Sequence, residues 1–174
     1  MLLFDNFKKL NIVFVDKKGD SVKDKKEYLE TLKFVKLSKD AVIPKRATGG
    51  SAGLDLCACA GKSILLKPGE RALIHTGIAI SLPKSDFVAL IFARSGLAIK
   101  HGITLSNGVG VIDSDYRGEI CVGLCNLSSE DYTINPGERI AQLVVMRVEA
   151  PTLFEVDSLD ETARGMGGFG STGK

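Results

Sequence analysis

The sequence predicts an all-β fold, either a sandwich or a barrel. Two observations predict it. From Lys33 onward, short apolar or alternating runs recur along the chain. Turn signals such as Pro-Gly, Leu-Pro and Asn-Gly separate these runs, and this spacing is typical of many short strands.

The elements follow in chain order. Residues 1–32 are Lys-rich and lack both Pro and Arg, which sets them apart as an N-terminal extension. Within them, Ser21 to Leu32 fits a short capped helix or a poorly ordered segment. A single helical turn is expected after Ser95, between two strands. The predicted strands are Phe34–Leu37, Ile64–Leu66, Ala72–Ile80, Phe87–Phe92, Ile120–Leu127 and Ile140–Val148, with turns at 67–70, 82–85, 106–108 and 135–138.

Composition narrows the function. A length of 174 residues fits a single domain. The formal net charge of +2 argues against sequence-independent nucleic-acid binding, and no apolar run approaches the roughly 18 residues of a membrane span. Four cysteines and no export signal predict a soluble protein of a reducing compartment, the cytoplasm or the nucleus. We therefore expect neither a nucleic-acid partner nor a membrane.

The glycine-rich C-terminus, residues 164–174, contains the pattern G-x-x-x-x-G-K from Gly168 to Lys174. In a P-loop, a Ser or Thr follows the Lys and a helix N-terminus faces the phosphates. Neither follows Lys174 here. The pattern therefore predicts a flexible lid that closes over a nucleotide already held by the folded body.

Polar residues directly follow the predicted strand Phe87–Phe92. Arg94 offers a fork of donors suited to phosphate, Ser95 a hydroxyl, and Gly96 a backbone that a ligand can approach closely. A strand end with an exposed Arg and a Ser cap explains the same tripeptide, so both interpretations stay open.

Asp113 follows two β-branched residues, Val111 and Ile112, which predicts an acid at the end of a buried strand. Such a carboxylate can hold a bound water. In an extended backbone, Asp115 would lie on the same face as Asp113, and the two carboxylates would then suit a metal ion. A solvated turn is the simpler interpretation of Asp115. We favour a functional role for Asp113 alone.

Gln142 places an amide in an otherwise apolar run. If the amide is buried, it needs a hydrogen-bond partner. A structural hydrogen bond within the protein and a contact with a ligand are equally good interpretations. The glycine-rich residues 47–56 favour a surface loop that leads into a strand.

Other polar residues are interpreted as structural. A Ser95–His101–Asp113 triad is rejected because no nucleophile elbow surrounds the serine, and His75 is interpreted as a strand residue. The cysteines lie in apparent strands without the two-residue spacing of a zinc knuckle, and we expect them to be buried small hydrophobes. They are Cys57, Cys59, Cys121 and Cys125.

Taken together, the clusters resemble the trimeric dUTPase family, deoxyuridine triphosphate nucleotidohydrolases. Five family motifs occur in order, and the resemblance runs from about Lys33 to the C-terminus. Leu54 stands where the family usually has Tyr, and Met166 fills a variable position. The motifs are residues 52–56, 93–98, 110–119, 139–143 and 164–173.

The resemblance implies a jelly-roll-like distorted β-barrel over residues 33–163 and a mobile lid over residues 164–174. It also implies a homotrimer whose C-terminal tail is exchanged between subunits. The implied reaction is dUTP + water → dUMP + pyrophosphate, with Mg²⁺ held mainly by the substrate triphosphate. That reaction limits uracil incorporation into DNA and supplies dUMP for dTMP synthesis.

The resemblance also implies a role for each site residue. Asp113 would hold the 3′-hydroxyl and orient or deprotonate the attacking water, while Asp55 would act on Mg²⁺ only through water. The hairpin from Ile99 to Val111 would recognise uracil with main-chain groups, and Tyr116 would pack under the deoxyribose. The remaining contacts to the nucleoside would be made by Asn107, Gly110, Val111 and Ile112, with Phe169 over the uracil. The phosphates would be held by Arg94, Ser95, Gly96, Gln142 and Arg164, and the γ-phosphate would be enclosed by Gly170, Ser171 and Thr172. Arg94 and Gln142 would serve the substrate of a neighbouring subunit.

Two rivals remain. A dCTP deaminase on the same fold needs an additional acid near the pyrimidine C4. A trimeric binding or regulatory module would keep the nucleotide site without catalysis.

Overall fold

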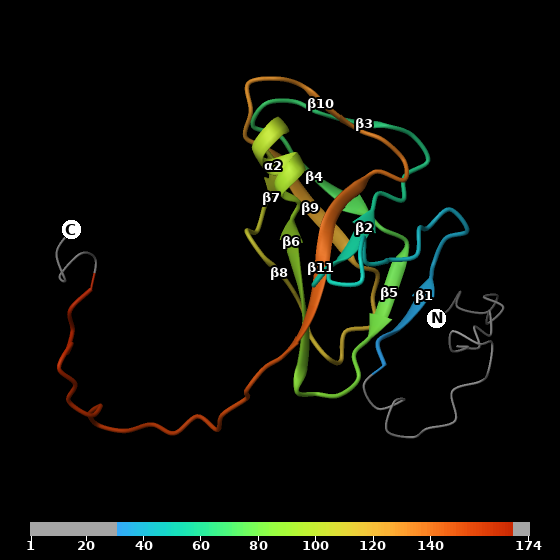
Figure 1. The fold of residues 1–174 in the computed structure, drawn as a ribbon. Coiled ribbons are helices and arrows are strands. Elements are labelled where there is room, and N and C mark those ends of the chain that lie inside the picture. Colours follow the sequence, from blue (N-terminus) through green and yellow to red (C-terminus); the bar gives the residue numbers. More distant parts are fainter. Residues whose placement is uncertain (1–30, 169–174) are drawn as a thin grey trace, which may run out of the picture.

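The computed structural model describes residues 31–168, and within that range the predicted all-β fold is confirmed (Figure 1). Short antiparallel strands surround one core, and one short helix interrupts them within residues 31–168. The strands are β1 (Lys33–Lys36), β2 (Leu54–Cys57), β3 (Ile64–Leu66), β4 (Arg71–His75), β5 (Ile78–Ser81), β6 (Phe87–Ala93), β7 (Ile103–Leu105), β8 (Gly110–Ile112), β9 (Cys121–Asn126), β10 (Tyr132–Ile134) and β11 (Arg139–Arg147), and the helix is α2 (Ser95–His101).

The strands form four small sheets. The largest has the order β2-β11-β6-β8, the next β4-β9-β7, and the remaining strands pair as β1-β5 and β10-β3. Leu56 and Leu143 of the first sheet join Ile74 and Leu124 of the second in one buried cluster. The sheets therefore close around a common core, as β-sheets with one apolar face must.

The long β11 organises the largest sheet. It pairs with β2 on one side and with β6 on the other, both antiparallel. Ala141 and Leu143 are buried, whereas Gln142 between them is only partly buried. Because alternate residues of a strand face opposite sides, this register turns Gln142 away from the core.

Several strands differ from their predicted bounds. The apolar run Ala72–Ile80 is two strands, because the chain bends at Gly77, whose φ is +66°. A Cβ at that glycine would lie 2.7 Å from Cβ of Ala41, so no side chain fits there. The strands β7 and β10 were not among the predicted runs, and each is only three residues long. β8 is the strand expected before Asp113.

The cysteines are less buried than predicted. Only Cys57 is buried, while Cys59, Cys121 and Cys125 are half-buried. All four are free thiols. The alternation along β9 explains two of them, since Cys121 and Cys125 lie on the face of that strand opposite the core residues.

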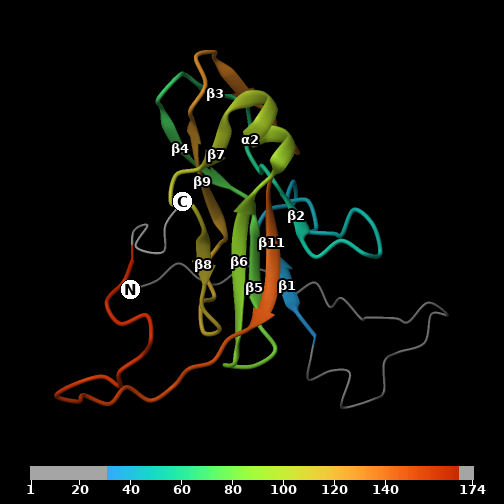
Figure 2. The ribbon, with the colours of Figure 1, turned by 60° about the vertical axis from the view of Figure 1, so that its left-hand side comes forward.

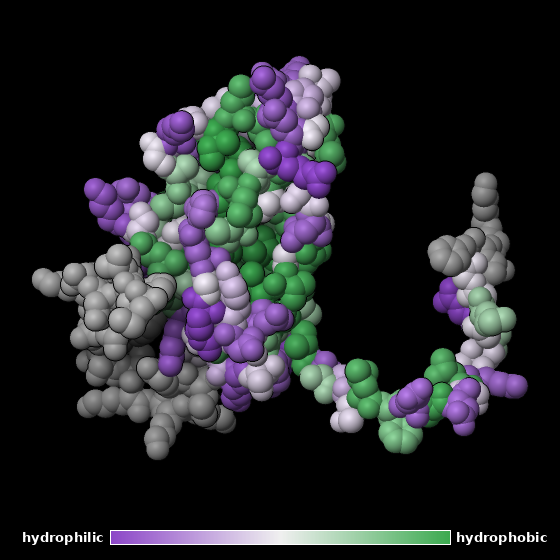
Figure 3. Space-filling view, turned by 180° about the vertical axis from the view of Figure 1, so that it is seen from behind, coloured by the Kyte–Doolittle hydropathy of each residue, from purple (hydrophilic) through white to green (hydrophobic). Residues whose placement is uncertain are grey.

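After β11 the chain leaves the body as an extended arm (Figures 1 and 2). Figure 3 shows hydrophobic residues both along the body and along this arm. Leu153 is 94% exposed and Phe154 86% exposed, values unusual for large apolar side chains. The possible helix at Ser21–Leu32 falls almost wholly outside the described residues.

Within the described residues 31–168, no helix is long and apolar enough to cross a bilayer.

Candidate active site

Asp55 on β2 holds two arginines that come from distant parts of the chain. Its Oδ1 lies 3.2 Å from Nε of Arg94, and its Oδ2 lies 3.1 Å from Nη1 of Arg139. The Asp55 side chain is only 17% exposed, and Arg94 also donates from Nη1 to the carbonyl of Arg139 at 3.0 Å. The three side chains form one network, which fixes the guanidinium of Arg94 at the end of β6.

The start of α2 tests the alternative interpretation of residues 94–96, a strand end with an exposed Arg and a Ser cap. The N-cap position of α2 is Arg94 itself, with extended backbone and no side-chain cap hydrogen bond. Ser95 is the first helical residue, and its side chain is exposed. The alternative of an exposed Arg followed by a Ser cap is therefore wrong. At Gly96 an added Cβ would meet nothing within 4 Å, so the surface above it is open.

Gln142 lies beside the same network. Its Nε2 donates to the carbonyl of Ala93 at 3.0 Å, so the amide is structurally anchored and its Oε1 points elsewhere. A Cβ at Gly53 would lie 2.9 Å from that Oε1, which explains a glycine in the loop before β2. The register also pairs Gln142 with Asp55 across β2 and β11. Asp55, Arg94, Arg139 and Gln142 therefore form one polar surface, which we call the arginine cluster.

Asp113 lies at the end of β8, and the expectation of a buried strand there is wrong. β8 is the outermost strand of its sheet, Val111 is 60% exposed, and Asp113 is exposed as well. The backbone N–H of Tyr116 donates to the carbonyl of Asp113 at 3.1 Å and closes a turn. Asp115 lies in that turn and is exposed, as predicted.

The segment predicted as a hairpin, Ile99 to Val111, is not a hairpin: Ile99 lies in α2, and the two arms β7 and β8 belong to different sheets and do not pair with each other. β7 is the last strand of the three-stranded sheet and β8 the last strand of the four-stranded sheet. The turn between them holds Asn107, which is exposed. Among the described residues, each arm therefore keeps one edge without a strand partner. Main-chain donors and acceptors on such edges are available to a ligand.

Tyr116 is held next to Asp113 by its own loop. Its hydroxyl donates to the carbonyl of Glu119 at 3.0 Å, and the ring remains 44% exposed. A Cβ at Gly118 would lie 2.4 Å from the hydroxyl oxygen, so only glycine leaves room for this ring position.

Asp113 and the arginine cluster lie at opposite ends of β6. Ile112 pairs with Ala89, whereas Arg94 follows the far end of that strand. The five residue-to-residue steps from Ala89 to Arg94 span about 17 Å of extended chain. Because β8 runs antiparallel to β6, Asp113 continues away from Arg94. One chain therefore does not bring these two groups together.

Arg164 lies in a turn of the C-terminal arm. Its Nε donates to the carbonyl of Gly167 at 2.9 Å, and the residue is exposed. The predicted contacts Phe169, Gly170, Ser171 and Thr172 lie outside the described residues.

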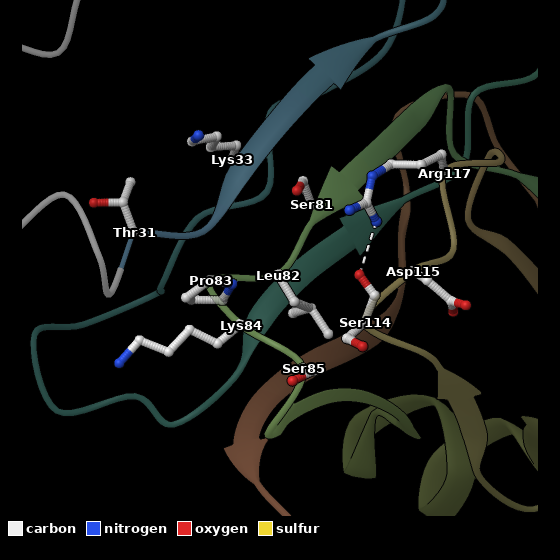
Figure 4. A pocket seen from close by; sticks show the side chains of 10 residues that line it. All are labelled: Thr31, Lys33, Ser81, Leu82, Pro83, Lys84, Ser85, Ser114, Asp115 and Arg117. Atoms are coloured by element: carbon white, nitrogen blue, oxygen red, sulfur yellow. Dashed lines mark hydrogen bonds between the residues drawn. The ribbon is translucent and has the colours of Figure 1, made fainter.

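A hollow of about 420 Å³ lies behind the Asp113 loop (Figure 4). The β5–β6 connection, with Lys84, lines one side, and the residues after Asp113, with Arg117, line the other. Lys33 at the start of β1 lines it as well. Nη1 of Arg117 donates to the carbonyl of Ser114 at 2.8 Å and braces this loop. Asp113 itself does not line the hollow.

No role was predicted from the sequence for Arg139, although it is the first residue of the motif at 139–143. Its partner Asp55 lies 84 positions earlier in the chain, so only the pairing of β2 with β11 brings the two together. Both oxygens of Asp55 are engaged by guanidinium groups. Asp55 is therefore poorly suited to bind a metal ion directly.

The comparisons with known proteins agree with one another. Residues 39–173 match the family model described as dUTPase. A deoxyuridine 5'-triphosphate nucleotidohydrolase of Desulfitobacterium hafniense is 50% identical over 140 residues, which is 80% of this chain and 93% of that protein. The enzyme of the same name from Wolinella succinogenes is 52% identical over 143 residues, 82% of this chain and 94% of its own.

Solved structures give the same result. A mutant dUTPase of Staphylococcus bacteriophage 80alpha with dUpNHpp superposes with a TM-score of 0.75 at 30% identity, covering 83% of this chain and 99% of that one. A mutant dUTPase of phage phi11, described with a structural Mg(II) ion, superposes with a TM-score of 0.68 at 27% identity, covering 75% and 99%.

Proposed function

The chain belongs to the dUTPase family and hydrolyses dUTP to dUMP and pyrophosphate, and we propose that it does so in sites shared between copies of the chain. The observation that carries this proposal is the separation of Asp113 from Arg94 along β6. A gap of about 17 Å or more exceeds the reach of three linked phosphates. If β7, β8 and Asp113 of one copy face the arginine cluster of another copy, one bound nucleotide can contact both groups.

The nucleoside would lie between β7 and β8. The strand edges left open there supply main-chain donors and acceptors for uracil, with help from Asn107. Cytosine would leave those groups unpaired, which is a strong basis for discrimination. The exposed ring of Tyr116 would pack under the deoxyribose and exclude a ribose 2′-hydroxyl. The backbone of Gly110, Val111 and Ile112 completes this subsite.

The phosphates would contact the arginine cluster of a neighbouring copy. Arg94 is held in place by Asp55, so little conformational entropy is lost when its remaining donors bind an anion. The Ser95 hydroxyl is exposed beside it, and the open surface at Gly96 allows close approach to the backbone. Gln142 borders the same surface.

Asp113 would hold the 3′-hydroxyl and accept a proton from the attacking water. The water oxygen bonds to the α-phosphorus in line with the bridging oxygen to the β-phosphate. That bridging bond breaks, and pyrophosphate leaves with its electron pair. The carboxylate is a weak base, so positioning and charge stabilisation contribute much of the acceleration.

Mg²⁺ is the metal we propose for the reaction, where it would neutralise charge on the triphosphate. It typically keeps several waters and binds through substrate phosphates, and this pattern suits a site in which Asp55 is already paired. Asp55 would act on the hydrated ion only through water and chiefly positions Arg94.

We propose a homotrimer in which the C-terminal arm crosses to another copy. The arm leaves the body with exposed Leu153 and Phe154, and further apolar side chains such as Ile99 are 86% exposed on the body itself. Exposed apolar residues of this kind mark interaction surfaces. The arm would bring Arg164 to the phosphates of a site built by the other two copies. Phe169, Gly170, Ser171 and Thr172 would then close over the bound nucleotide.

We place the enzyme in the cytoplasm or nucleus, where free thiols persist. Its four cysteines are all unpaired, which favours a reducing compartment.

The test of this function is pyrophosphate release from dUTP, dCTP, dTTP and UTP at equal concentrations. The account predicts release from dUTP, with the other three at least a hundredfold slower. Ammonia released from dCTP would instead support a deaminase. Binding of dUTP without turnover would support a regulatory module.

A further inference from the structure

Three side chains with different metal-binding atoms converge at the surface where the end of β4 meets the start of β9, and none of them is among the residues proposed to contact the substrate. Nδ1 of His75 lies 2.8 Å from Oε2 of Glu119 and 3.5 Å from Sγ of Cys121. The nitrogen, oxygen and sulfur atoms all lie within 4.8 Å of one another. This is the only such group of three among the described residues.

The backbone fixes this convergence. His75 and Cys121 are directly opposite in the antiparallel pairing of β4 with β9, so their side chains emerge side by side on one face. Glu119 precedes β9 by two positions, and its Oε1 accepts the backbone N–H of Gly77 at 2.7 Å. That hydrogen bond orients the carboxylate and leaves Oε2 directed at His75.

The donor set and its spacing fit zinc. Zinc–nitrogen and zinc–sulfur bonds at tetrahedral angles separate the two ligand atoms by about 3.6 Å, close to the 3.5 Å between His75 and Cys121. The corresponding nitrogen–oxygen separation is about 3.3 Å, so Glu119 would move outward by about half an ångström. Imidazole and thiolate also favour zinc over magnesium, which prefers oxygen ligands.

The site would have one open position. The His75 side chain is 61% exposed in the single chain and that of Glu119 is 25% exposed, so the cluster reaches the surface. Three protein ligands therefore leave room for a water, or for a donor from another copy, as the fourth ligand.

We propose that His75, Glu119 and Cys121 form a binding site for a zinc-class divalent cation, distinct from the substrate-bound Mg²⁺. The amino-acid sequence does not reveal this site, because the three residues do not have the spacing of a zinc knuckle. Only the cross-strand pairing of β4 with β9 assembles the ligands.

The test is titration of untagged, chelator-treated protein with Co²⁺, followed by visible and near-ultraviolet absorption. We expect one equivalent per chain to produce a sulfur-to-cobalt charge-transfer band together with intense tetrahedral d–d bands. Added Zn²⁺ should remove both. Zn²⁺ should also raise the midpoint of thermal unfolding, because it binds only the folded chain.

Cys121→Ser should lose the charge-transfer band, and His75→Ala should weaken Co²⁺ binding at least tenfold. The matched control is Cys125→Ser, a half-buried thiol on the same face of β9, which should keep the full spectrum. Circular dichroism would verify that each variant is folded. No band in the wild type, or an unchanged band in Cys121→Ser, would overturn the proposal.

Discussion

The carboxylate of Asp55 lies 3.2 Å from Nε of Arg94 and joins β2 to the end of β6. We predict that Asp55→Asn lowers kcat/KM for dUTP at least tenfold, because Arg94 loses the partner that positions it. The same change should lower the free energy of unfolding by about 1–3 kcal/mol, since two guanidinium groups lose their counter-charge. Steady-state kinetics and urea unfolding measure the two effects.

The matched control is Asp86→Asn. Asp86 lies 3.1 Å from Arg147, but both side chains are substantially exposed, at 44% and 58%. Exposed pairs contribute about 0–1 kcal/mol, so this variant should retain near-normal stability and activity. Equal losses in the two variants would contradict a positioning role for Asp55.

Gly53 leaves room for Gln142, and Gly53→Ala tests that contact. The new methyl group would lie 2.9 Å from Oε1 of Gln142 and would force the amide to move. We expect a loss of about 1–3 kcal/mol in the free energy of unfolding. KM for dUTP should rise as well. The control Gly50→Ala adds a methyl group where nothing lies within 4 Å, and it should behave like the wild type.

Glu119 links stability to pH. Burial alone would raise the pKa of Glu119, but hydrogen bonds from His75 and the Gly77 backbone outweigh it and hold this pKa below its ordinary value of 4.5. A lowered folded-state pKa contributes stability that is complete above pH 4.5 and disappears as pH falls through the folded value. Unfolding midpoints of the wild type should therefore fall with pH below that point.

Glu119→Gln removes this linkage. Its stability at pH 7 should be lower by about 1–3 kcal/mol, and its midpoint should fall less steeply in acid. Glu149→Gln, at an exposed position, is the control and should keep the wild-type acid profile. Parallel wild-type and Glu119→Gln curves would contradict the assignment.

Asp113→Asn should reduce pyrophosphate release by about 10²–10⁴-fold, because the amide cannot accept the proton of the attacking water. Binding of dUpNHpp should survive with modest weakening, which calorimetry can measure. Asp115→Asn, two residues along the same exposed loop, should stay within a few-fold of the wild type. Unchanged turnover in Asp113→Asn would exclude this residue as the base.

Sequence pattern was sufficient for the larger part of the fold. Long apolar runs such as Phe87–Phe92 predicted their strands because many consecutive residues carry the signal. Short strands gave mixed results: the three-residue run Ile64–Leu66 and the pair Val111 and Ile112 were recognised from their apolar residues, whereas β7 and β10, also three residues long, were missed. The chain bends at Gly77 with a positive φ, and the neighbouring Ala41 leaves no room there for a side chain; no local pattern encodes that packing.

Some residues of the candidate site could also be predicted from the sequence, and others could not. Asp113, Arg94 and Gln142 were singled out from local chemistry. Pairing between distant strands determined the rest: Arg139 joined Asp55 through β2 and β11, and His75 joined Cys121 through β4 and β9. The exposure of Asp113 was also missed, because β-branched neighbours indicate a strand without indicating whether that strand is at the edge of a sheet.

The most direct test of a shared active site is complementation between two inactive variants. Asp113→Asn and Arg94→Ala protein would be unfolded together in equal amounts, refolded, and assayed for pyrophosphate release from dUTP. If each site takes Asp113 from one copy and Arg94 from its neighbour, random mixed trimers should recover about a quarter of the wild-type activity. If the mixture is no more active than the two variants refolded separately, while refolded wild type regains its activity, both residues act within one chain and the account is wrong.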